Sequence, residues 1–424
     1  MGAIGVIFFT MKTWITYLAA LFMGLATTLL FGDSVYISSV LSTLSGLVGS
    51  IGVLLFIPLV LIGFSAGVAS LRKDGLGGKN LAGIISWSVV TAVLLPVISA
   101  LLFTLHPVSF PVSSTAGYEA FPESFITSVF TSAGRELLMS NVYYTLATST
   151  GFILPVVIIA WILGYALKPN ADVIKPAYMT INSFSEVMFR LSRTYTVFSY
   201  IIVYIASAQF FTGLYQEKTV FVAPEFLIVF LSVTAILSLI VLPILYAVFT
   251  KGKRNPYKDT FRSISAMTAG LTTSNILTVA PIAEATGRHG NGVQKRVSAT
   301  AVPLFTMIGR GGTASITALS ALALITAVTG NAPDIRTALI IASFSALASF
   351  TTSIATGFEV MFTLLIVFRM SGISLYGAEM TVLGILPLVN GLAIMLDAQI
   401  MMLGSVVASR FIRTDVKPPY KDIL

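Results

Sequence analysis

The sequence predicts an all-α membrane protein with eight transmembrane helices and two re-entrant helical hairpins. Of its 424 residues, 56% are hydrophobic and only 10% are charged, and the mean hydropathy is +0.93. Soluble domains carry about 25% charged residues, so lipid must surround most of this protein. A spanning helix needs about 20 apolar residues, and the chain has room for about eight to ten of them.

Six apolar segments in the first 250 residues are each long enough to cross a bilayer. They are 14–31, 45–70, 80–105, 142–167, 195–214 and 224–250. Charged residues or clusters of Pro and Gly separate them, as expected of loops between spans. Two further spans are expected toward the C-terminal end, at 297–328 and 378–410.

Two other segments are apolar at both ends but polar in the middle. Segment 261–290 is interrupted by LTTSN at 271–275, and segment 335–372 is interrupted by FTTSIATG at 350–357. Irregular backbone at membrane depth is tolerated only beside protein or a water-filled cavity, and two such interruptions point to a solute-binding site. We therefore expect two hairpins that each enter and leave on one side. The alternative is two ordinary spanning helices whose Ser and Thr residues pack against neighbours.

The distribution of Lys and Arg favours the hairpins. With a cytoplasmic N-terminus and both hairpins in place, 20 Lys and Arg residues fall on the cytoplasmic side and four fall outside, as the positive-inside rule requires. If segment 261–290 crossed only once, Lys295, Arg296 and the basic C-terminal tail would move outside. The sequence thus predicts a multi-pass protein of the inner (cytoplasmic) membrane with both termini in the cytoplasm. Whether the chain starts at Met1 or Met11 stays open.

Two stretches carry a more specific pattern. The stretch LLFIPLVLIGFSAGVAS at 54–70 has a Pro within an apolar run that ends in small residues, and AVPLFTMIGRGGT at 301–313 ends in a glycine cluster. With the order of the hairpins and spans, they resemble the dicarboxylate/amino acid:cation symporter family, which includes glutamate and aspartate transporters, as a divergent member. The likeness extends over most of the chain.

The resemblance implies a homotrimer of elevator-type transporters. It implies a scaffold formed by residues 12–75 and 125–215, and a transport domain formed by residues 76–124 and 216–424. The transport domain would contain the third and sixth helices, the hairpins 261–290 and 335–372, the seventh helix at 297–328 and the eighth helix at 378–410. The second hairpin would be the extracellular gate.

Several positions depart from the family pattern. The family motif Asn-Met-Asp-Gly-Thr reads Gly-Arg-Gly-Gly-Thr at 309–313, so that Gly309 and Gly311 stand at sodium-coordinating positions. Met401 stands where the family has a sodium-binding aspartate, and Ser88 and Val89 replace a Thr-Ser pair of its deepest sodium site. Sodium prefers oxygen ligands that carry negative charge. We therefore expect no metal site of the usual kind and no usual sodium coupling.

The substrate positions in the eighth helix also differ. Asn390 stands where the family has an aspartate that holds the substrate amino group, and Ala393 replaces an arginine that holds the side-chain carboxylate. Asp397 replaces an asparagine. The departures predict poor binding of acidic amino acids and favour a small neutral or monoanionic solute.

Arg310 is the basic residue that the topology places deep in the membrane, where a charge costs at least about 3 kcal/mol. Arginine stays protonated, so it needs a carboxylate partner. Asp397 is the first candidate and Glu359 the other. Three roles stay open: a buried ion pair that only fixes packing, a tethered cation in place of sodium, and direct binding of a substrate carboxylate.

The candidate substrate-binding residues come from the hairpin tips and from the seventh and eighth helices. They are Ser274, Asn275, Thr313, Thr352, Ser353, Asn390 and Asp397. Hydroxyls and free N–H groups at half-helix ends favour anionic groups, although Ser and Thr at such tips also serve as helix caps.

The expected function is secondary transport of a small amino acid or carboxylate-type solute, with Arg310 as a tethered cation. A sodium- or proton-coupled symporter of the same family, or a membrane solute sensor that does not transport, is the alternative. The chain has no Cys and only two His residues, and no nucleophile and base pair stands within the spans, so we expect neither an enzyme nor a cofactor. The expected partners are the solute, membrane lipid and two further copies of the chain, and not nucleic acid.

Overall fold

The computed structural model describes residues 13–111, 127–131, 152–217, 223–373 and 378–412. Helices account for every regular element in these ranges. Seven helical segments in them are long and apolar enough to cross a membrane. The predicted fold class, an all-α membrane protein, is therefore confirmed. Part of the expected fourth span, residues 142–151, lies outside the described residues, and the helix α8 (Leu154–Ala166) accounts for the rest.

The N-terminal helices pack along one very long helix. They are α2 (Thr13–Phe31), α3 (Val35–Pro58) with its continuation η1 (Leu59–Phe64) and α4 (Ser65–Lys73), and the long helix is α9 (Lys175–Glu217). The Tyr17 hydroxyl donates to the Thr196 carbonyl at 2.9 Å. A Cβ atom on Gly24 would lie 2.3 Å from Ser207 Oγ, so glycine allows the close helix contact that is common between membrane helices.

Two of these helices are longer than the sequence predicted. The expected span 45–70 begins at Val35, and the expected span 195–214 begins at Lys175. The N-terminal half of α9 contains polar side chains, and the helix continues through them because the first hairpin packs against that half. Ser192 Oγ donates to the Pro281 carbonyl at 2.6 Å, and Arg288 pairs with Glu186 at 3.3 Å.

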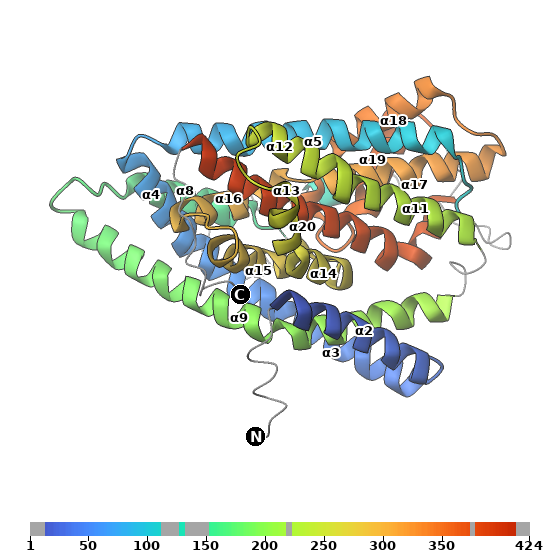
Figure 1. The fold of residues 1–424 in the computed structure, drawn as a ribbon, viewed down its shortest axis with the longest axis horizontal. Coiled ribbons are helices and arrows are strands. Elements are labelled where there is room, and N and C mark those ends of the chain that lie inside the picture. Colours follow the sequence, from blue (N-terminus) through green and yellow to red (C-terminus); the bar gives the residue numbers. More distant parts are fainter. Residues whose placement is uncertain (1–12, 112–126, 132–151, 218–222, 374–377, 413–424) are drawn as a thin grey trace.

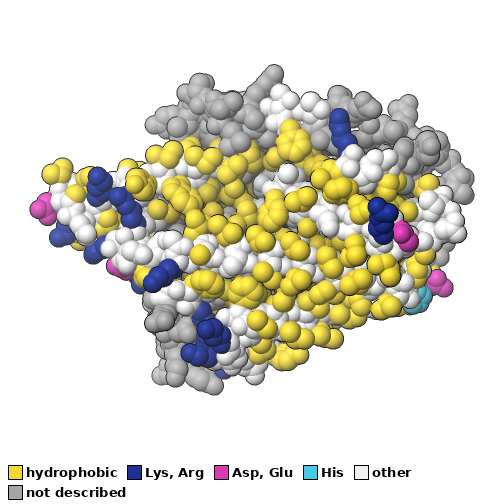
Figure 2. Space-filling model, turned by 90° about the horizontal axis from the view of Figure 1, so that it is seen from above, with side chains coloured by type: hydrophobic (Ala, Val, Ile, Leu, Met, Phe, Trp, Pro, Cys, Tyr) yellow, Lys and Arg dark blue, Asp and Glu magenta, His cyan; other side chains and the backbone are white. Residues whose placement is uncertain are grey.

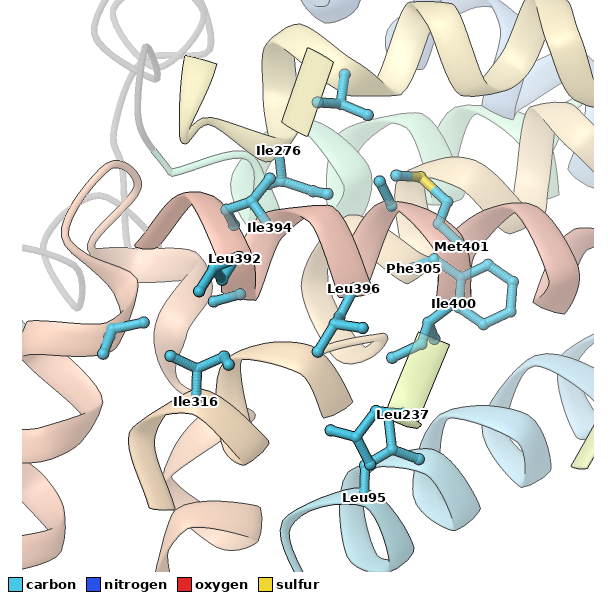
Figure 3. Close-up of a cluster of buried hydrophobic side chains, with 14 of the residues drawn as sticks. Leu95, Leu237, Ile276, Phe305, Ile316, Leu392, Ile394, Leu396, Ile400 and Met401 are labelled. Atoms are coloured by element: carbon cyan, nitrogen blue, oxygen red, sulfur yellow. The ribbon is translucent and has the colours of Figure 1, made fainter. Parts of the chain in front are cut away.

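The remaining helices surround α20 (Leu386–Phe411), which lies between α5 on one side and α14, α15 and α9 on the other (Figure 1). They are α5 (Gly77–Leu105), α11 (Pro224–Ile236) with η2 (Leu237–Val241) and α12 (Leu242–Phe249), α13 (Pro256–Arg262), and η4 (Ala378–Ile385) before α20. Leu95 of α5 and Leu237 of η2 belong to the same buried apolar cluster as Leu396 and Ile400 of α20 (Figure 3).

Each polar interruption separates two helices that pack against each other. The first hairpin consists of α14 (Ile264–Thr273) and α15 (Ile276–His289), and the second of α18 (Ile335–Ser349), η3 (Thr352–Ile354) and α19 (Glu359–Ser371). At the first tip Ser274 is left-handed with φ of 48°, and the Asn275 side chain accepts from the Leu277 N–H at 2.9 Å. The helix–turn–helix shape thus comes from local capping.

The expected seventh helix at 297–328 corresponds to one apolar segment, Lys295–Thr329, that is long enough to cross a membrane and is broken in its middle. It consists of α16 (Lys295–Ile308) and α17 (Gly311–Thr329), with non-helical backbone at Gly309 and Arg310. Glycine favours this break because it resists helix formation. The break places the N-terminus of α17 in the centre of the protein.

The surface matches a lipid environment. Figure 2 shows a broad hydrophobic belt on one face, with most of the visible Lys and Arg side chains gathered at one end. That end contains the start of α9 and the loop between α4 and α5, as the shared horizontal axis of Figures 1 and 2 shows. Most of the Lys and Arg side chains visible on this face therefore gather at one end of the folded protein.

Candidate solute site

Arg310 lies at the break between α16 and α17 and is fully buried. Its Nη1 is 3.5 Å from Asp397 Oδ2 and 3.8 Å from Glu359 Oε1. Both carboxylates that the sequence offered as partners therefore flank the same guanidinium. One cation faces two anions, so the group carries a net negative charge when both carboxylates are ionised.

The start of α17 binds the Asp397 side chain through three hydrogen bonds. Its Oδ1 accepts from the N–H groups of Gly312 and Thr313 at 2.7 and 3.2 Å, and its Oδ2 accepts from Thr313 Oγ1 at 2.6 Å. The first N–H groups of a helix lack partners within the helix and favour negative charge. Asp397 therefore caps α17 from a neighbouring helix, and Thr313 is a direct partner of Asp397.

Glu359 begins α19 and has one free oxygen. Its Oε2 accepts from the Gly357 N–H at 2.8 Å and from Asn390 Nδ2 at 2.9 Å. Its Oε1 has no hydrogen-bond partner among the described residues, although Arg310 lies within 3.8 Å. Arg310 Nε and Nη1 also lack hydrogen bonds there. A donor and an acceptor that both lack a hydrogen bond, Arg310 Nη1 and Glu359 Oε1, thus lie 3.8 Å apart in a buried site.

Asn390 joins the tips of both hairpins. Its Nδ2 donates to the carbonyls of Ser274 and Gly357 at 3.0 and 3.2 Å, and its Oδ1 accepts from the Val360 N–H at 3.2 Å. Ser274 adds a hydrogen bond from its Oγ to the Pro387 carbonyl at 3.3 Å. One amide in the eighth helix therefore connects Ser274 of the first hairpin with Gly357 and Glu359 of the second.

Three of the expected site residues lie apart from this cluster. Asn275 caps α15 and lines a cavity of about 750 Å³ between the first hairpin, α3 and α9. Thr352 Oγ1 donates to the Ser349 carbonyl at 2.7 Å, as a helix cap does, and Ser353 is buried at the second tip. The hydrogen bonds and ion pairs described above join Ser274, Arg310, Thr313, Glu359, Asn390 and Asp397 into one cluster, and they include none of these three residues.

Packing closes the positions at which the resemblance implies sodium ligands. A Cβ atom on Gly309 would lie 2.8 Å from the Phe305 carbonyl, and one on Gly311 would lie 2.8 Å from the Thr91 carbonyl. Met401 is fully buried within the apolar cluster of Figure 3. Gly309 and Gly311 therefore have no room for an acidic side chain without movement of their neighbours, and Met401 offers no oxygen ligand.

Gly312 lies so close to α20 that a side chain there would overlap it. A Cβ atom would be 2.5 Å from both the Ala393 carbonyl and Leu396 Cβ. We expect Gly312→Ala to lower the free energy of unfolding by about 1–3 kcal/mol, because overpacking forces helices apart. Thermal unfolding of the purified protein in detergent measures this. Gly46→Ala, where nothing lies within 4 Å, is the control, and equal stability of the two variants would contradict the contact.

Comparison with protein families identifies the chain. The profile described as the sodium:dicarboxylate symporter family matches residues 11–411, which include every element of the site. The chain belongs to this family. The resemblance proposed from the sequence is therefore confirmed, and the chain is a multi-pass membrane protein of a family of secondary transporters rather than of enzymes. The comparison with curated proteins gives no match.

Within the sodium:dicarboxylate symporter family, this chain has a buried charge cluster in which Arg310 at the break in the seventh helix faces Glu359 of the second hairpin and Asp397 of α20. The sequence did not predict Glu359 as a substrate-binding residue. It indicated Glu359 only as a possible partner of Arg310. A carboxylate two residues after Gly357, within an apolar hairpin, was the available signal, because a buried charge in a membrane is seldom without function.

Proposed function

We propose that this protein transports a small neutral or monoanionic amino-acid-type solute without sodium, with Arg310 as a tethered cation. The observation that carries the proposal is the fully buried Arg310 beside Asp397 and Glu359, at the motif where the family resemblance implies sodium ligands. The closed packing at Gly309 and Gly311 supports it. A cation that belongs to the chain moves with it and cannot be released, so a sodium gradient would not drive transport through it.

We propose an elevator mechanism in a homotrimer, with scaffold residues 12–75 and 125–215 and transport-domain residues 76–124 and 216–424. The packing supports this division, since α2 and α3 pack on α9, whereas α5 packs on α17, α18 and α20. The hairpins would enter the membrane from opposite sides, with both termini cytoplasmic. The gathering of Lys and Arg at one end of the molecule supports that orientation (Figure 2).

The charge balance of the cluster supports the substrate class. Arg310 already faces two carboxylates, so a second carboxylate on the solute would find no free cation. A zwitterionic amino acid would bring its own ammonium group. Ser274, Thr313, Asn390 and Asp397 are the proposed contacts, together with the backbone of both hairpins, and Asn275, Thr352 and Ser353 are secondary candidates at the tips.

A thermal-shift screen with and without sodium tests the proposal. A ligand at 100 times its Kd stabilises the folded state by about 2.7 kcal/mol. We expect stabilisation by one or more small neutral amino acids or monocarboxylates, equal in sodium and choline chloride, and none by aspartate or glutamate. Micromolar binding of aspartate, or an affinity about tenfold weaker without sodium, would contradict the proposal. Uptake of the identified solute into proteoliposomes separates a transporter from a sensor, which binds without accumulation or exchange.

A further inference from the structure

A second buried carboxylate group lies outside the Arg310 cluster. Glu284, in the second helix of the first hairpin, is fully buried, and neither of its carboxylate oxygens has a hydrogen-bond partner among the described residues. Its nearest cations, Arg288 and Lys295, each pair with the partly exposed Glu186 at 3.3 Å. Among the residues that the structure describes, Glu284 takes part in no ion pair.

The helix geometry places Glu284 between two neighbours of α15. Pro281 and Arg288 face α9, since they contact Ser192 and Glu186. Gly287 faces α16, because its Cβ position lies 3.9 Å from Ser298 Oγ. At 3.6 residues per turn, Glu284 lies on the side of α15 between these two directions.

Both neighbouring helices carry a buried hydroxyl without a partner. Ser185 of α9 and Ser298 of α16 are each fully buried, and their Oγ atoms make no hydrogen bond within the part of the chain that the structure describes. Such groups are rare in folded proteins, where nearly all buried polar atoms are paired. Three adjoining elements therefore each contribute an unsatisfied polar group to this region.

A cavity at the basic end of the protein borders this region. It has a volume of about 560 Å³ and lies between α4, α9 and the start of α16. Ser185, Arg288 and Lys295 line it, and so does Ala299, the neighbour of Ser298. The cavity is large and polar enough to contain water, and it reaches the residues that surround Glu284.

An ionised carboxylate without a partner costs several kcal/mol when it is buried, whereas a protonated carboxyl is neutral and can donate a hydrogen bond. We propose that Glu284 is a proton-binding site of the first hairpin, protonated in this conformation and in exchange with the water of the cavity. On release, the O–H bond breaks, the proton passes to water and the carboxylate remains. If the proposed transport function holds, this site makes movement of the hairpin proton-linked.

The other charged and titratable groups around α15 leave Glu284 as the unpaired one. They are Arg288 and His289 on α15, Glu186 and Tyr195 on α9, Lys295 and Arg296 on α16, Asp397 and Arg410 on α20, and Arg254, Asp259 and Arg262 before α14. The carboxylates among them have cationic partners: Glu186 with Arg288 and Lys295, Asp259 with Arg254 and Arg262, and Asp397 with Arg310.

Infrared spectroscopy of the purified protein tests the proton site without any substrate. We expect a carbonyl stretching band of a protonated carboxylic acid at neutral pH, lost in Glu284→Gln and retained in Glu186→Gln. The band should shift in D₂O within minutes, because the cavity admits water. Its absence from the wild type at neutral pH, or its persistence in Glu284→Gln, would overturn the proposal, and so would a Glu284 band that does not exchange with D₂O.

A pH series of thermal unfolding gives an independent measurement. The folded protein retains a proton on Glu284 that the unfolded chain loses above about pH 4.3, so wild-type stability should fall relative to Glu284→Gln as the pH rises. Parallel curves for the two proteins would contradict the site. If Glu284→Gln does not fold, Glu284→Asp should move the infrared band to a new position. These readouts stand even if no transported solute is found.

Discussion

Replacing Arg310 by methionine is expected to lower the free energy of unfolding by about 3–5 kcal/mol, because it leaves buried carboxylates without their cation. Asp397 and Glu359 are both within 3.8 Å of the guanidinium. The measurement is unfolding of the purified protein in mixed micelles with increasing denaturant. Arg336→Met is the control, since Arg336 is exposed on α18, and a surface substitution of this kind changes stability by less than about 0.5 kcal/mol.

Removal of the unpaired charges should restore stability in steps. Arg310→Met with Asp397→Asn neutralises one carboxylate, and we expect partial recovery because Glu359 remains charged. Adding Glu359→Gln should recover most of the loss, since buried ion pairs can be replaced by neutral groups of similar shape at little cost. A triple variant no more stable than Arg310→Met alone would show that the cluster does not act through its charge.

Replacing Asn390 by alanine is expected to separate the hairpin tips. The change removes hydrogen bonds to the carbonyls of Ser274 and Gly357, to Glu359 Oε2 and from the Val360 N–H. Each buried polar group left without a partner costs about 1–3 kcal/mol. Since about 1.4 kcal/mol corresponds to a factor of ten in an equilibrium, the open state of the tips should become at least about tenfold more populated.

A single cysteine at Ser353 reports this opening, because the chain has no other cysteine and Ser353 is buried at the second tip. We expect its rate of maleimide labelling to rise about tenfold or more in Asn390→Ala. Gln399→Ala is the matched control. Gln399 is also a buried amide of α20, but its side chain exchanges hydrogen bonds with Ser238 of η2 and not with a hairpin. Equal labelling of the two variants would show that Asn390 does not hold the tips closed.

Composition and apolar patterning were sufficient for the fold class. The low charge content excludes a surface that is mainly exposed to water. Apolar segments of this length form spanning helices, because a helix satisfies its own backbone hydrogen bonds within the membrane. The helix–turn–helix shape of the two hairpins was also predictable, because Ser and Thr interrupt each apolar segment at its centre. The family followed from the order of these elements and from the stretches 54–70 and 301–313.

The limits of the elements depended on tertiary contacts. The sequence predicted α9 to begin near residue 195, but it begins at Lys175, because the first hairpin provides partners for its polar side chains. The break at Gly309 and Arg310 divides the expected seventh helix for a related reason. Asp397 supplies the cap that the new helix start requires, and Asp397 is 84 residues from Thr313 along the chain.

The sequence by itself determined that a buried arginine exists and that Asp397 or Glu359 must balance it, because an arginine cannot lose its charge inside a membrane. Only the tertiary structure decided that both carboxylates flank it, that Asn390 joins the two hairpin tips, and that Glu284 is buried without a partner. Residue type fixes which groups need partners. The distances between helices far apart in the chain, which local patterns do not encode, decide which partners they obtain.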